Sequence, residues 1–289
     1  MAAGGSREAG QRADAQKTKF PNMNEENVSQ QSSAVAEPRE QLVATVEQTT
    51  GYKVVIDTVE GIGEDAQMIS ARPELPVHTI RVSKAKLHHA DYIVANQCAM
   101  LLRIWAESAR IPVFSPVAGK VSYFAGRTAN SKPLSQLPVK VAQEVAMNLV
   151  QGLLHQVRSM PLEILTVRDC RELCPDLHDM QAEAVESQLR LLSHILAPRI
   201  RSIAPDQIWR NNVSMNAAFA LNWSGLSGSP LAMLPYESAG FSQIAAKLLG
   251  EVNAKSAKTT EAYTQLVDSW AEQVGLRTLY KWEYRNGRQ

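Results

Sequence analysis

The stretch DYIVANQCAMLLRIW, Asp91–Trp105, has the residue spacing of an amphipathic helix. Its apolar residues recur every three or four positions, which places them on one helix face. They are Val94, Cys98, Leu101, Leu102 and Trp105. The opposite face carries Asn96, Gln97 and Met100, in the positions that the histidine, the glutamate and the second histidine occupy in the zinc-binding motif H-E-x-x-H. Residues four apart stack over one turn of a helix, so this face has the spacing of a metal site without its ligands.

The segments before this helix predict a small sheet. YKVVIDT, residues 52–58, is short and β-branched, and VHTIRVS, residues 77–83, alternates side-chain character with a period of two. A short helix from about Arg39 is expected to precede the first strand, with Gly51 as its stop.

The chain after the quoted helix is predicted to be mostly helical. Residues 108–138 contain repeated prolines and glycines and are expected to be irregular. Helical periodicity then recurs in residues 139–157, 179–196, 205–223, 239–252 and 259–276. No internal repeat is visible. The sequence therefore predicts one α+β domain with a small N-terminal β-sheet and a helical majority.

Composition narrows the class of protein. The 289-residue chain has 30 Lys and Arg against 29 Asp and Glu, a balance that argues against a nucleic-acid partner. Its three cysteines, Cys98, Cys170 and Cys174, are odd in number and lie in apolar or helical patterns, which favours reduced thiols and a cytoplasmic location. The sequence has neither an apolar run of about 18 residues nor the apolar core of a secretory signal, so no membrane partner is expected.

Residues 1–38 differ from the rest of the chain. They are rich in Ala, Gly, Ser, Gln, Asn and Glu and hold almost no large apolar side chains. Such a composition cannot offset the entropy lost on ordering, so a disordered tail is expected. Met1 and Met23 both remain candidate start sites.

Several segments in order resemble the ImmA/IrrE-like predicted zinc metallopeptidases of bacteria. They are the strand at 77–83 leading into the quoted helix, MPLEILTVRDCRELCPDLHDMQAEAVESQL at 160–189, and VDSWAEQVGLRTLYKW at 267–282. The resemblance covers most of the chain from about Gln41 onward. It implies a zincin-like fold over residues 39–289, with a peptidase-like core at 39–168 and a helical part at 169–289. It also implies an acidic third zinc ligand from a later helix, and matching the motif P-I-D-L-R-I-E-R to Pro161–Arg168 puts that position at Val167.

The chemistry of that family does not carry over to these residues. A peptidase zinc needs two imidazoles, a third ligand and a glutamate that takes a proton from the bound water. Asn96 and Gln97 are weak neutral donors, Gln97 cannot act as a base, and the thioether of Met100 is a poor zinc ligand. We therefore expect no zinc and no catalytic residues at Asn96, Gln97, Met100 and Val167. The alternative is that these four are ordinary helix residues and the spacing is coincidence.

Other candidate sites are weaker. Cys170, Cys174 and His178 are four residues apart and would offer three ligands along one helix face, but Pro175 tends to end the helix there. His88 and His89 are adjacent, so on a helix they point about a quarter-turn apart and are expected to be capping or exposed residues. No G-x-S-x-G motif indicates a serine hydrolase.

The leading hypothesis is a catalytically inactive metallopeptidase-like protein that acts by protein–protein binding, in a regulatory, defence or stress system. The resemblance implies another protein as partner, for example a helix-turn-helix regulator or a subunit of a complex. Two alternatives remain open. One is an active metal-dependent hydrolase that uses Cys170, Cys174 and His178 or the His88–His89 pair, and the other is a structural subunit of a larger complex.

Overall fold

The structure is a computed structural model that describes residues 38–62, 65–107, 110–255 and 257–286. Residues 36–289 form one compact unit. The predicted tail, residues 1–38, lies outside the described residues except for Pro38, which opens the first helix. The fold is α+β with a helical majority and two small sheets, which confirms the predicted fold class at this level.

The N-terminal sheet has three strands in the order β1-β3-β2. Helix α1 (Pro38–Thr50) leads through Gly51, which has a φ of +71°, into β1 (Lys53–Val59). Strand β3 (Val77–Ser83) pairs in parallel with β1 and antiparallel with β2 (Ala66–Ile69). The two predicted strands are confirmed. The four-residue strand β2 was not predicted, because AQMI is too short to show a period.

Helix α2 (Ala90–Ile104) follows the 3₁₀ turn η1 (Lys84–His89) and matches the predicted helix. Its apolar stripe packs into the core: Cys98 and Leu101 are fully buried, and Trp105 is 1% exposed. The indole N–H of Trp105 donates a 2.9 Å hydrogen bond to Oγ of Ser70. The stripe therefore fixes which side of α2 faces the core and leaves the other side to face a cavity.

The prediction that residues 108–138 are irregular is wrong for residues 110–129 and holds for the turns at 130–138. Residues 110–129 contain strand β4 (Arg110–Pro116) and helix α3 (Ala118–Ala129). Strand β4 pairs antiparallel with the C-terminal strand β5 (Tyr280–Asn286), and the rings of Phe114 and Tyr280 stack at 4.0 Å. The partner strand lies more than 160 residues away in the chain, so the local sequence carries no signal of the pairing. Among the described residues, β5 is the one strand that pairs with β4.

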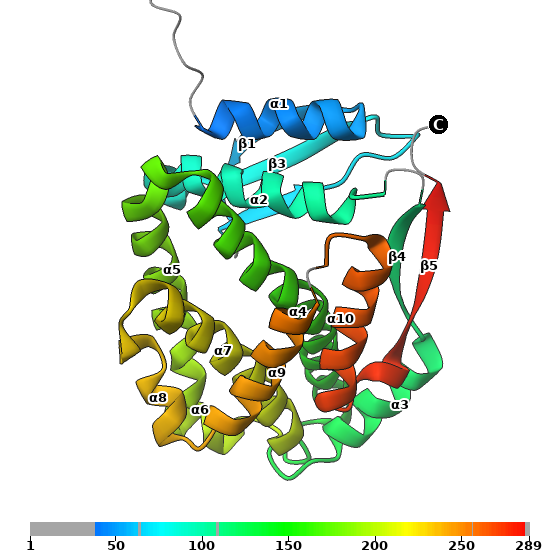
Figure 1. The fold of residues 1–289 in the computed structure, drawn as a ribbon. Helices are drawn as coiled ribbons and strands as arrows, with labels where there is room; N and C mark the ends of the chain where they lie inside the picture. The colour runs from blue at the N-terminus through cyan, green and yellow to red at the C-terminus, as the bar shows by residue number, and fades with distance from the viewer. Residues whose placement is uncertain (1–37, 63–64, 108–109, 256, 287–289) are drawn as a thin grey trace, which may run out of the picture. The chain divides into compact units, whose positions relative to one another are not determined.

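Helix α4 (Val139–Leu173) is the longest element and crosses the unit (Figure 1). It runs through Pro161, whose missing N–H removes one backbone hydrogen bond, and ends before Pro175 as the sequence predicted. The other long helices are α5 (His178–Ser193), α7 (Asp206–Ser227), α9 (Ser242–Ala254) and α10 (Thr260–Gln273). Shorter elements are η2 (Pro175–Leu177), η3 (His194–Leu196), α6 (Pro198–Ile203), η4 (Pro230–Ala232), α8 (Leu234–Ser238) and η5 (Arg277–Leu279).

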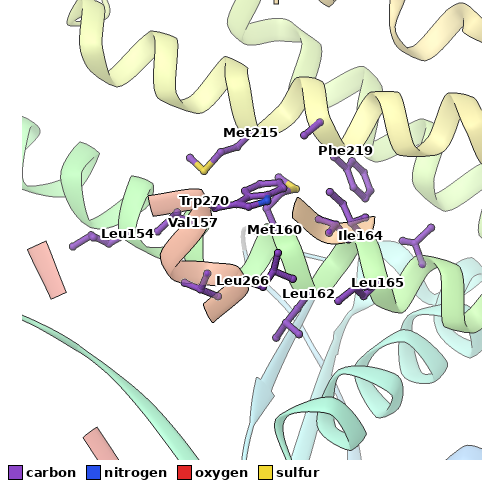
Figure 2. Packing of buried hydrophobic residues seen from close by; sticks show 14 of the residues in the cluster. Leu154, Val157, Met160, Leu162, Ile164, Leu165, Met215, Phe219, Leu266 and Trp270 are labelled. Carbon is purple, nitrogen blue, oxygen red and sulfur yellow. The ribbon is translucent and has the colours of Figure 1, made fainter. Parts of the chain in front are cut away.

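The core lies where α4 packs against α7 and α10. Figure 2 shows Met160 of α4, Met215 and Phe219 of α7 and Trp270 of α10 converging at this point. Trp270 is fully buried, and its indole N–H donates a 2.9 Å hydrogen bond to the Leu248 carbonyl. Among the described residues, no helix combines the length and the apolar character that a membrane span requires.

Candidate functional site

Asn96, Gln97 and Met100 line one cavity of about 1290 Å³. All three come from the face of α2 opposite its core stripe. Asn96 is 8% exposed, and Gln97 and Met100 are half-buried. The helix therefore presents the three motif positions to a single space, as the i and i+4 spacing requires.

The side-chain amide of Asn96 has no hydrogen-bond partner in the part of the chain that the structure describes. Its Oδ1 atom is buried without a partner. Buried polar atoms are nearly always hydrogen-bonded, because leaving one unpaired costs about 1–3 kcal/mol. An unpaired amide at a cavity wall is thus a position where a bound molecule or water gains a hydrogen bond.

Val167 does not join these residues. It is 1% exposed and is not among the described residues that line the cavity. Its backbone carbonyl accepts a 2.8 Å hydrogen bond from Nε2 of Gln181, which ties α4 to α5. The structure therefore brings three of the four predicted positions together, and Val167 belongs to the packing behind the cavity wall.

Glu163 is the carboxylate of α4 that reaches this cavity. It lies one helical turn before Val167, and its Oε1 accepts a 2.5 Å hydrogen bond from Nε2 of Gln188 on α5. The motif alignment points to position 167 and therefore passes over Glu163. A signal was present, since Glu163 is the only charged residue in the run MPLEILTV at 160–167, and an isolated carboxylate in an apolar run points to a polar contact.

Helix α4 gives the cavity a polar stripe. Asn148, Gly152, Gln156, Ser159 and Glu163 all line it and recur at helical spacing along about 22 Å of the helix. Nε2 of Gln156 donates a 2.6 Å hydrogen bond to Oδ1 of an asparagine on α7, while its Oε1 is buried without a partner. The stripe thus contains a second amide with unused hydrogen-bonding capacity.

The remaining walls of the cavity are mostly apolar. They come from β2, α2, the loop before α4, α5, η3, α6 and α7, and their apolar side chains include Ile93, Met100, Ile104, Leu191, Leu192, Ile195, Ile200, Ile203 and Ile208. Leu191 and Ile203 are each 58% exposed. A cavity with apolar walls and a few convergent polar groups is the usual form of a binding site.

The cysteine candidate does not form a reactive site. Cys170 and Cys174 are 2% and 1% exposed, and burial raises the pKa of both thiols. Burial also raises the pKa of Cys98 to about 12. The ring Nε2 of His178 lies 2.6 Å from the carbonyl oxygen of Arg171 and is engaged there. Thiols of this kind stay protonated and are poor nucleophiles and metal ligands.

The expectation for the His88–His89 pair holds in part: His88 is exposed, and His89 stands at the N-cap position of α2, although its side chain makes no capping hydrogen bond. The two rings lie 3.9 Å apart, and His89 is 4% exposed, so it is neither turned away from His88 nor exposed. Both residues sit on the 3₁₀ turn η1, where side-chain directions differ from those of an α-helix. Nε2 of His89 is 3.5 Å from Glu183, and burial, followed by the charge of His88, lowers the pKa of His89.

The residues at the cavity do not fit a catalytic zinc ion. Two amides and a thioether take the places of two imidazoles and a general base, and Val167 has no donor atom in its side chain. Among the described residues, no three His, Cys, Asp or Glu side chains are grouped so that they could hold a metal ion. The absence of bound zinc stays a prediction.

In comparisons with family models, with curated proteins and with solved structures, no match to the chain was found.

Proposed function

We propose that the protein is a catalytically inactive, zincin-like relative of the metallopeptidases that binds a segment of another protein in the cavity beside α2. The loss of catalysis is supported by Asn96, Gln97 and Met100, which line this cavity and cannot assemble a hydrolytic zinc site. In this proposal the site binds a segment of another protein and does not hydrolyse it.

The observation that carries the proposal is the Asn96 side chain. It matches the first ligand position of the motif, it is nine-tenths buried, and among the described residues its Oδ1 has no hydrogen-bond partner. A side-chain amide donates and accepts a hydrogen bond in the same way as a peptide group does. Asn96 is therefore suited to pair with the backbone of a bound segment.

The shape of the cavity supports the same class of ligand. The polar stripe on α4 extends for about 22 Å, which matches roughly six or seven residues of extended chain. The amides of Asn148 and Gln156 lie on this stripe, where they can meet a peptide backbone, while the apolar walls can accept side chains. We propose a cytoplasmic protein as partner, which the buried free thiols support; the resemblance suggests a helix-turn-helix regulator or a complex subunit.

Gly152 offers a direct test. It lies on the exposed side of α4 at the cavity, and a Cβ atom added there meets no atom within 4 Å. Gly152→Trp should therefore place an indole in the cavity, on the polar stripe, without disturbing the core. The matched control is Gly250→Trp on α9, where a Cβ atom also meets nothing within 4 Å and which does not line the cavity.

The experiment is quantitative affinity purification of the tagged protein and both variants from the cells that produce it. A protein recovered with the wild type and with Gly250→Trp, and depleted about tenfold or more with Gly152→Trp, is the expected result. Equal recovery of every co-purifying protein with all three chains would contradict binding in the cavity. Thermal melting of each variant shows whether it is folded.

A further inference from the structure

A segment rich in cations contributes three residues, Pro133, Leu134 and Leu137, to the lining of the cavity. Residues 108–143 contain five Lys and Arg and no Asp or Glu, although the whole chain is nearly neutral. Four of these cations are exposed and lie on α3, on the loop after it and at the start of α4. We call Lys120, Arg127, Lys132 and Lys140 the basic surface.

The four cations have no partner among the residues that the structure describes. None of their side chains makes a hydrogen bond or an ion pair within the described ranges, whereas many other cations of the chain are paired, for example Arg103 with Asp169. The first carboxylate further along is Glu144, one turn after Lys140. The charge of the basic surface is therefore available to a ligand.

The basic surface and the cavity share one segment. Pro133, Leu134 and Leu137 line the cavity, while Lys132 directly precedes them and Lys140 follows three residues after Leu137. Helix α3, which carries Lys120 and Arg127, packs against α4, which carries Lys140 (Figure 1). A bound partner segment that leaves the cavity past Leu137 thus passes close to Lys132 and Lys140.

Apolar side chains accompany the charge. Tyr123 is 70% exposed, and Val139 is 74% exposed between Pro138 and Lys140. A small hollow of about 380 Å³ beside α3 is lined by Lys120, Tyr123 and Arg127. Apolar contact beside cations fits a ligand that carries carboxylates next to apolar groups.

We infer that the cavity's partner segment is acidic on the side that passes Leu137, with Asp or Glu residues that pair with the basic surface. The inference rests on the proposed function, because it assigns the cavity's occupant a second point of contact. Each exposed ion pair contributes little binding free energy. The acidic end of the partner segment therefore affects selectivity and association rate more than total affinity.

The test uses a phage-displayed library of random peptides selected on the purified full chain. The informative variant is Lys132→Glu with Lys140→Glu, and the matched control is Lys247→Glu with Lys258→Glu, two exposed lysines elsewhere that undergo the same change of charge. All four are surface positions, and a melting curve confirms that each variant folds. The same library is also selected on the Gly152→Trp variant, in which the indole obstructs the cavity.

The expected peptides combine an apolar run with an acidic flank. Replacing the acidic residues of a selected peptide by glutamine should weaken its binding about tenfold at low salt and much less at high salt. This preference should vanish with Lys132→Glu/Lys140→Glu and persist with Lys247→Glu/Lys258→Glu.

The two proposals fail in different ways. The selected peptides could be apolar, show no enrichment of Asp or Glu, and fail to bind the Gly152→Trp variant. This result would overturn the inference of an acidic flank and leave the cavity proposal standing. Peptides recovered equally with Gly152→Trp would overturn both. Binding to vesicles of phosphatidylcholine and phosphatidylserine that requires Lys132 and Lys140, with no acidic enrichment among the peptides, would overturn the inference in favour of a lipid surface.

Discussion

Nε2 of Gln188 donates a hydrogen bond of 2.5 Å to Oε1 of Glu163, so that α5 holds a carboxylate of α4 at the cavity wall. The same cavity receives Asn96 and Met100 from α2. A carboxylate thus lies on the same cavity as the two residues that the proposed alignment matches to the histidines of H-E-x-x-H, one helical turn from where that alignment puts it.

Restoring ligands at α2 should create a zinc site that uses Glu163. The variant Asn96→His, Gln97→Glu, Met100→His, with Val167 unchanged, is expected to bind one zinc ion in isothermal titration. Adding Glu163→Gln should weaken that binding by at least about tenfold, because it removes the anionic ligand.

The alignment of the motif makes the opposite prediction, in which Val167→Glu completes the site. Val167 is 1% exposed and lies outside the cavity lining. Val167→Glu should therefore bury an unpaired carboxylate and cost about 3 kcal/mol or more of stability without improving zinc binding. Tighter zinc binding with Val167→Glu would show that the alignment is right and that Glu163 is not the ligand.

Stability should depend on His78 between about pH 6.5 and 4. Nδ1 of His78 accepts a 3.0 Å hydrogen bond from the N–H of Ala71, and Nε2 lies 3.0 Å from Oγ1 of Thr50, so the buried ring is neutral. Burial, followed by the charge of Arg285, lowers the pKa of His78 to about 4. The unfolded chain then binds the extra proton first, and the free energy of unfolding should fall as the pH drops through this window.

Urea unfolding at a series of pH values tests this dependence. His78→Gln should be less stable than the wild type at neutral pH because it breaks the contacts of the ring, but its stability should change less between about pH 6.5 and 4. Equal slopes for the two proteins across this range would mean that His78 does not carry the effect.

The three cysteines should resist alkylation in the native protein. Cys98, Cys170 and Cys174 are buried and free, and burial raises the pKa of each thiol. Iodoacetamide at about pH 8, where only thiolates react, should leave all three unmodified until the chain unfolds. Rapid native labelling of Cys170 or Cys174, followed by mass spectrometry, would instead support the hydrolase alternative at these residues.

Protein purified without added zinc should contain far less than one zinc ion per chain. A structural zinc ion contributes roughly 10 kcal/mol or more to folding, so its removal would lower the melting temperature strongly. We expect no change in melting temperature with EDTA. Elemental analysis that finds one zinc ion per chain would contradict the loss of the metal site.

Local periodicity predicted the elements whose core contacts lie on one face. The quoted helix is α2 almost to the residue, and the strand at 77–83 is β3, because Cys98, Leu101 and Ile80 mark their buried faces. Strands β4 and β5 were missed because each is stabilised by the other from the far end of the chain.

The site was predictable only in part for the same reason. Asn96 and Met100 share one helix, so their spacing alone placed them on the same cavity. The carboxylate of Glu163 reaches the same cavity from α4, and which side of α4 lines the cavity is set by tertiary contacts, such as the hydrogen bond of Gln181 on α5 with the Val167 carbonyl. No periodicity in the sequence reports those contacts.

Photocrosslinking from the cavity wall tests the central claim most directly. Benzoylphenylalanine replaces Gln97, a half-buried residue of the cavity, and in a control chain it replaces Gln243, which is exposed on α9 and does not line the cavity. After irradiation in the cells that produce the protein, mass spectrometry identifies the crosslinked peptides. We expect crosslinks from position 97 to recur in one partner segment that contains apolar residues, and we expect no crosslink to that segment from position 243. The same crosslinked proteins from both positions, or none from position 97, would contradict a cavity that binds another protein.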